Sequence, residues 1–332
     1  MKSNLRSIPN LRSVFILSML SLAIWNNQVV LAQSQIPLEK EESIDPPPLD
    51  QIPQNEEGEM IKYGRELIVN TSQYLGPNGS VAKMSNGMNC QNCHLDAGTK
   101  AYANHYLAVH ATYPKMRARS MTIETLSKRV NDCFERSLNG KTLKEDSKEM
   151  LAILVYMKWL GSNHRVGHRD QRYTIKELKF LDRAADPQKG KAVYEKHCTS
   201  CHQANGEGLA HPGIKGAFLF PPLWGKSSYN QAAGLFRLSR FAGFVKDNMP
   251  HLTSNHDHPI LSDEEAWDVA AYVNSQPRPS FKKQKNDWPD ISKKPVDHPF
   301  GPFIDPFTEN QHKYGPFQAI VDWQKSNQQK LK

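Results

Sequence analysis

The sequence is poor in the residues that build thick aliphatic cores, and it has few cysteines. Only 38% of its 332 residues are hydrophobic, whereas proline and glycine contribute 22 and 19 residues. Each of its two Cys-x-x-Cys pairs lacks a second Cys pair nearby. A structural zinc site needs four ligands in closed geometry, so this arrangement argues against zinc. Basic and aromatic residues are not interleaved, which argues against a nucleic-acid-binding protein.

Long apolar runs are also scarce. The run from Val14 to Ile24 is too short for a membrane span, and it follows three basic residues, Lys2, Arg6 and Arg12. With Val30-Leu31-Ala32 after it, the segment has the pattern of a secretory signal peptide. We predict cleavage after Ala32 and no stable membrane insertion afterwards, with an uncleaved anchor as the alternative.

Charge is unbalanced toward the basic side. The formal net charge is +8, and residues 1–32 hold three of the positive charges and no acidic residue, which leaves +5 on the mature chain. A basic surface of this kind favours small anions or an acidic redox partner.

Two Cys-x-x-Cys-His motifs account for four of the five cysteines: Cys90 to His94 and Cys198 to His202. This spacing attaches a c-type haem covalently, with two thiols on the porphyrin and the adjacent histidine on the iron. Two c-type haems are therefore expected. Because such haems are attached after export, the sequence predicts a periplasmic protein. The low apolar content fits small, loop-rich domains in which haem forms part of the core.

The two motifs lie in halves built on the same plan. Helices are expected at 57–70, near 122–138, near 147–160, and from the capping residue Ser262 to about Asn274. Matching residues occur in both halves, namely Gly64 and Gly190, Glu149 and Glu265, Tyr156 and Tyr272. The fold class predicted is mainly α, with two tandem cytochrome c-type domains, each around one covalent haem, and an extended C-terminal strap.

Domain boundaries follow from composition. The expected segments are a signal peptide (1–32), a proline-rich linker (33–55), cytochrome c domain 1 (56–162), an interdomain linker (163–184), cytochrome c domain 2 (185–276) and a tail packed on the domains (277–332).

The sixth iron ligand decides between an electron carrier and a catalyst. For the second haem the best candidate is Met249, which lies 48 residues after Cys201 and next to a proline. Lys246 could compete in its neutral form. A methionine that merely fills the core is the alternative.

The first haem lacks an equivalent Asn-Met-Pro loop. Met84 and Met88 are too close to Cys90 to reach the opposite face, and His105 or His110 could give a bis-histidine site. Cys133 is the more informative candidate, because it is the one cysteine that haem attachment leaves over in an exported protein.

The surroundings of Cys133 suggest a function. Arg129, Cys133 and Ser137 are spaced i, i+4, i+8, so a helix presents all three on one face. Arg119 approaches from the preceding stretch. Guanidinium groups stabilise a thiolate in its nucleophilic, metal-binding form and can hold a dianion by forked hydrogen bonds. A solvated basic helix face is the alternative.

Four segments together resemble the dihaem thiosulfate dehydrogenases, and the segment around Cys133 is the most specific: Tyr63 to Leu67, Asn86 to Gly98, Arg129 to Ser137 and Pro295 to Pro302. The resemblance implies His94 and Cys133 as ligands of the first haem iron. It implies His202 with Met249, or Lys246 in one redox state, at the second. It also implies that Arg119, Arg129 and Ser137 line the substrate pocket.

The reaction implied by the resemblance joins two thiosulfate ions into tetrathionate, or runs in reverse as a tetrathionate reductase. Fixed positive charges would lower the barrier to bringing two dianions together. Electrons would pass from the first haem to the second and then to a soluble cytochrome or another high-potential acceptor. Two other functions remain open: a dihaem electron carrier without its own substrate, and a cytochrome that conjugates thiosulfate to a carrier protein.

Overall fold

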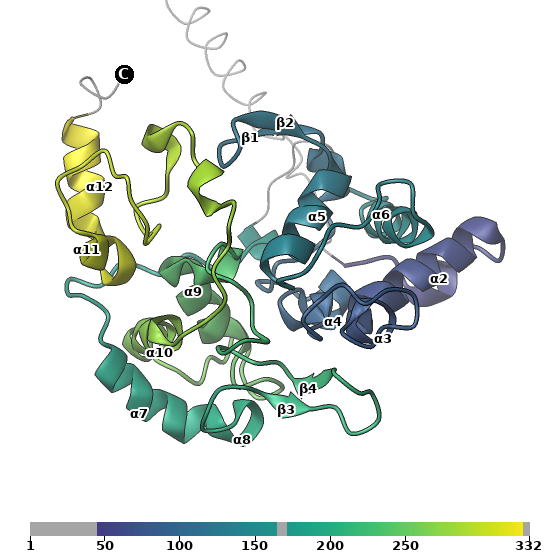
Figure 1. Ribbon diagram of the computed structural model, residues 1–332, viewed down its shortest axis with the longest axis horizontal. Helices are drawn as coiled ribbons and strands as arrows, with labels where there is room; N and C mark the ends of the chain where they lie inside the picture. Colours follow the sequence, from purple (N-terminus) through teal and green to yellow (C-terminus); the bar gives the residue numbers. More distant parts are fainter. Residues whose placement is uncertain (1–44, 165–170, 328–332) are drawn as a thin grey trace, which may run out of the picture. The chain divides into compact units, whose positions relative to one another are not determined.

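The computed structural model describes residues 45–164 and 171–327, which form a mainly helical unit with two short hairpins (Figure 1). The predicted signal peptide and residues 33–44 of the predicted linker lie outside the described residues. Within the described ranges, no helix is both long and apolar enough to cross a membrane. Ile52, in the part of the linker that is described, is buried in the core of the first domain.

The first domain is organised by two crossing helices, α2 (Glu56–Val69) and α6 (Lys148–Leu160). They pack closely because Gly64 has no side chain: a Cβ there would lie 2.1 Å from the carbonyl oxygen of Ala152. Around this pair the chain forms further short elements: α3 (Thr71–Leu75), η3 (Cys90–Asn92), α4 (Leu95–Gly98), β1 (Lys115–Arg117), β2 (Thr122–Glu124) and α5 (Leu126–Arg136).

The second domain repeats this crossing with α7 (Pro187–His197) and α10 (Asp263–Ser275). A Cβ on Gly190 would lie 1.9 Å from the carbonyl oxygen of Asp268. Both glycines also approach matching tyrosines, Tyr156 and Tyr272, so the internal repeat predicted from the sequence is confirmed. The remaining elements are α8 (Thr199–His202), β3 (Leu209–Ala210), β4 (Phe218–Phe220), η6 (Gly234–Phe236) and α9 (Leu238–Asn248).

The segment expected to be one helix near 122–138 contains two elements. Thr122 to Glu124 pair with β1 in an antiparallel hairpin, and α5 begins only after Thr125, whose side chain accepts a hydrogen bond from Lys128 N. The threonine N-cap ends the strand and starts the helix. Cys133 remains on the helix, as expected.

The C-terminal tail adds packing to both domains. It carries two short helices, α11 (Glu309–Tyr314) and α12 (Phe317–Ser326), within the segment expected to be an extended strap. Phe317 and Ile320 are buried in the core of the second domain. Nearer the start of the tail, Asp287 forms a two-pronged ion pair with Arg136 of α5.

Candidate active site

The first haem-binding motif opens onto a cavity enclosed by the first domain. Its apolar wall includes Ile68, Tyr106, Val130, Phe134 and Met157, and its reactive lining consists of Cys90, Cys93, His94, Arg129, Cys133 and Ser137. The structure therefore brings together six of the seven residues predicted for the first haem and its substrate pocket, and Arg119 is the exception. An apolar cavity with two thiols and a histidine at one side suits a c-type haem.

The two motif histidines are oriented in the same way. Nδ1 of His94 lies 2.6 Å from the carbonyl oxygen of Asn104, and Nδ1 of His202 lies 2.8 Å from that of Pro221. A carbonyl only accepts, so Nδ1 must donate in both rings, which leaves Nε2 available to bind iron. Burial lowers the pKa of His202, which also favours the neutral, metal-binding form.

Cys133 differs electrostatically from the haem-attaching cysteines. Burial raises the pKa of Cys90, Cys93 and Cys198 to about 12. Burial acts on Cys133 in the same direction, but the charge of Arg129 and a hydrogen bond with His94 outweigh it and lower its pKa to about 6. Nη1 of Arg129 donates to Sγ of Cys133 over 3.0 Å. Cys133 is thus held as a thiolate facing the proximal histidine.

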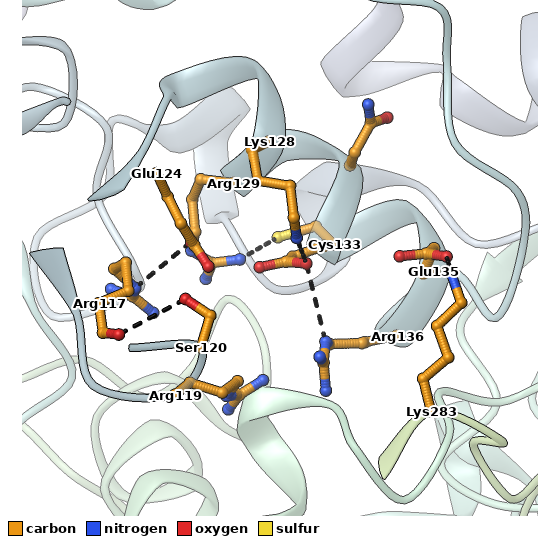
Figure 2. A network of polar contacts seen from close by, with 12 residues as sticks. Arg117, Arg119, Ser120, Glu124, Lys128, Arg129, Cys133, Glu135, Arg136 and Lys283 are labelled. Atoms are coloured by element: carbon orange, nitrogen blue, oxygen red, sulfur yellow. Dashed lines mark hydrogen bonds and ion pairs between the residues drawn. The ribbon is translucent and has the colours of Figure 1, made fainter. Parts of the chain in front are cut away.

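The remaining predicted substrate residues, Ser137 and Arg119, differ in whether they line the first cavity. Ser137 is the C-cap of α5 and lines the first cavity. Arg119 lies on the turn between β1 and β2 and is not part of the lining of that cavity; Nη1 of Arg119 donates to the carbonyl oxygen of Ala232 over 3.2 Å. Figure 2 shows its side chain extending toward Arg136.

The second motif faces a cavity of its own. Cys198, Cys201, His202 and Met249 all line it. Lys246 does not: its Nζ donates to the carbonyl oxygen of Leu261 over 2.7 Å and pairs with Asp263 at 2.8 Å. These contacts favour Met249 over Lys246 as the sixth ligand in the conformation described.

The bis-histidine alternative for the first haem receives no support from the cavity lining. Neither His105 nor His110 lines the first cavity, and Nδ1 of His105 accepts a hydrogen bond from Leu107 N. Among the described residues, no cluster of three or more His, Cys, Asp or Glu side chains is arranged to hold a metal ion, and none of the five cysteines forms a disulfide. Sites with so few protein ligands fit haem iron, because the porphyrin itself supplies four nitrogen ligands.

Sequence reasoning missed several residues of the site. Tyr113 and Lys115 also line the first cavity, and Lys115 Nζ lies 4.6 Å from the centre of the Tyr113 ring. Met88 lines both cavities, as does Cys93. Met88 is excluded as a ligand of the first haem by its closeness to Cys90, and the structure places it between the two haem sites instead.

Family models match both halves of the chain. The cytochrome c model matches residues 187–277, and the model of the SoxA/TsdA cytochrome c domain matches residues 80–166. The second of these includes the first haem motif and Cys133.

Named relatives match over most of the chain. The thiosulfate dehydrogenase of Allochromatium vinosum is 38% identical over 240 residues, which are 71% of this chain and 84% of that protein. The thiosulfate dehydrogenase of Stutzerimonas stutzeri is 35% identical over 239 residues, 72% of this chain and 74% of that protein. The solved structure of thiosulfate dehydrogenase (TsdBA) from Marichromatium purpuratum superposes with a TM-score of 0.63 at 34% identity over 71% of this chain, which spans only 49% of the solved chain. The chain therefore belongs to the thiosulfate dehydrogenase family, with two cytochrome c domains that each carry one covalently attached c-type haem.

Proposed function

We propose that the protein is an exported enzyme that oxidises two thiosulfate ions to one tetrathionate and passes two electrons to an external acceptor. The observation that carries this proposal is Cys133, a half-buried cysteine whose lowered pKa favours the thiolate, which pairs with Arg129 and faces His94. An electron carrier without a substrate has no need of a nucleophile at this position.

The residues around Cys133 each have a role in the proposed reaction. Arg129 supplies a fixed positive charge that attracts the first thiosulfate, and Ser137 offers a hydroxyl to its sulfonate. The sulfur of Cys133 and the outer sulfur of thiosulfate form an S–S bond, which releases two electrons. A second thiosulfate attacks the bound outer sulfur and displaces the Cys133 thiolate, so tetrathionate leaves and the site is restored. The two haems supply the capacity to accept two electrons.

The second domain provides the exit for electrons. Its cavity shares the lining residues Met88 and Cys93 with the first, so the two haem sites are adjacent. The net charge of +5 on the mature chain favours an acidic soluble cytochrome or another acidic high-potential acceptor. The basic, then apolar, N-terminal pattern supports a periplasmic location.

The test is turnover by the haem-loaded protein beside a Cys133→Ser variant. Purified protein is mixed with thiosulfate and an artificial acceptor, and both acceptor reduction and tetrathionate are measured; the reverse direction is assayed with tetrathionate and a reductant. We expect tetrathionate from the wild type and a loss of at least about a thousandfold in the variant, the scale seen when a nucleophile is removed. Both proteins must hold two haems per chain. Absence of turnover in both directions, with haem spectra unaffected by Cys133→Ser, would favour the electron carrier.

A further inference from the structure

The loop that follows the first haem motif has a strained backbone. Four of its residues other than glycine, namely Asp96, Ala97, Tyr102 and Asn104, have φ between 53° and 59°. This left-handed region is costly for a residue with a side chain, and a bulky tyrosine is a clear outlier there. The loop serves the haem site, because Nδ1 of His94 is hydrogen-bonded to Asn104 O at 2.6 Å. A strained segment therefore carries the acceptor that orients the proximal histidine.

Tyr102, the bulkiest of these residues, is held from outside the first domain at three points. Its backbone N–H donates to Arg172 O, in the expected interdomain linker, over 2.7 Å. Its carbonyl oxygen accepts a hydrogen bond from Nδ2 of Asn248 over 3.2 Å. Its ring is stacked on that of His256, with the centres 3.7 Å apart and the planes at 14°. Strained backbone persists where its surroundings fix it, and here the linker and the second domain do so.

The second-domain residues that contact Tyr102 are themselves fixed. Asn248 is 0% exposed at the end of α9, and its Nδ2 also donates to Phe244 O over 3.0 Å. Because both partners of this amide are carbonyl oxygens, its nitrogen must be the atom that faces Tyr102. Nδ1 of His256 lies 3.2 Å from Oδ2 of Asp247, whose side chain is 1% exposed. The loop of the first domain is therefore held by a rigid part of the second.

Asn248 directly precedes Met249, which lines the second haem cavity. We propose that Asn248, acting through Tyr102, is a positioning residue that couples the two haem sites. It holds the strained loop so that Asn104 O meets Nδ1 of His94. This hydrogen bond raises the basicity of a metal-binding imidazole, so its geometry tunes the iron that Nε2 binds. Coupling between two sites is reciprocal, so a change of ligation at Met249 also acts on His94. The proposal does not depend on which reaction the protein catalyses.

The test follows the Nδ1–H proton of His94. Holoprotein is reduced with titanium(III) citrate, which makes low-spin haem diamagnetic, and NMR of isotope-labelled histidine measures how fast this proton exchanges with solvent. Its closeness to the Tyr106 ring, which is stacked on His94 with the centres 4.4 Å apart, assigns the signal. The Nδ1–H of His202 is the internal control, because it is bonded to Pro221 O within the second domain.

Two variants weaken the contact with Tyr102 by different routes. Asn248→Leu removes the donor at similar size, and His256→Leu removes the stack at a partly exposed ring. The matched control is Ser254→Ala: the Ser254 hydroxyl donates to Lys246 O over 3.3 Å, so the change alters the Met249 side of the domain and keeps both contacts to Tyr102. Redox titration measures both reduction potentials, and haem content and the unfolding midpoint check folding.

We expect the His94 proton to exchange about tenfold faster in Asn248→Leu and His256→Leu, the effect of one lost interaction on local opening. The His202 proton should keep its rate. Both reduction potentials should move in Asn248→Leu, because a weaker hydrogen bond makes His94 a poorer electron donor. Ser254→Ala should leave His94 unchanged. An unchanged rate at His94 in both variants, an equal acceleration at His202, or the same effect in Ser254→Ala would overturn the coupling.

Discussion

At the scale of single residues, Asp297 shows why the tail sequence Pro295 to Pro302 is distinctive. Its carboxylate is 1% exposed and accepts hydrogen bonds from Nε of Arg237 at 2.8 Å and from Ser239 N at 3.1 Å. Burial acts to raise the pKa of Asp297, but Arg237 and Ser239 outweigh it and lower the pKa. The charged carboxylate is therefore a stabilising group that holds the tail to the start of α9.

Replacing Asp297 by Asn should cost about 3 kcal/mol of unfolding free energy at pH 7, because Arg237 loses its buried partner. A carboxylate with a lowered folded pKa stabilises above its unfolded pKa of about 4, and the stabilisation is lost as pH falls through the folded pKa. The gap between wild type and variant should thus close in acid, as denaturant titrations from pH 7 to pH 3 would show. Asp322→Asn, at an exposed position of α12, is the control. A loss below about 0.5 kcal/mol at pH 7 would refute the assignment.

At the scale of helices, the crossings of α2 with α6 and of α7 with α10 depend on glycine. Gly64→Ala and Gly190→Ala should each destabilise by at least about 2 kcal/mol, because the new methyl group meets backbone oxygen. Gly234→Ala is the matched control: a Cβ there has no heavy atom within 4 Å, and we expect no loss of stability. Denaturant unfolding followed by circular dichroism checks all three. Equal effects at Gly64 and Gly234 would show that close helix contact is not the reason for the repeat.

The sequence predicted the elements whose signals are local. The Ser262 cap predicts α10, and the paired glycines and tyrosines predict the internal repeat. Both signals are readable because capping and periodicity act within a few residues. The hairpin before α5 was missed, since Thr122 to Glu124 continue an apparently helical stretch and only pairing with β1 makes them a strand. That pairing is a tertiary choice, which local propensity cannot decide.

At the scale of the whole molecule, the site is assembled from segments far apart in the sequence. Arg129, Cys133 and Ser137 could be placed together from helical spacing alone. Trp288 could not, because it follows Cys133 by 155 residues and reaches Arg119 only through the folding of the tail. The sequence thus predicts the part of the site that one helix carries, and the structure adds the contact that the tail makes with Arg119.

Met88 lies where the haem cavities of the two domains adjoin. It is 3% exposed and, like Cys93, lines both haem cavities, so its side chain lies between the two sites. Met88→Ala should cost about 2–5 kcal/mol of unfolding free energy, because it leaves a cavity. Met88→Leu conserves volume and should cost less than about 1.5 kcal/mol.

The same substitution should affect both redox centres. Ferric haem carries one more positive charge than ferrous haem, so water that enters the space left by Met88→Ala stabilises the oxidised form and lowers both reduction potentials. Spectroelectrochemical titration of wild type, Met88→Ala and Met88→Leu resolves the two haems. A shift of both potentials in the alanine variant, with little change in the leucine variant, is the expected result. If only one reduction potential moved, Met88 would influence only one haem. The side chain would then not affect electron transfer between the haems through both sites.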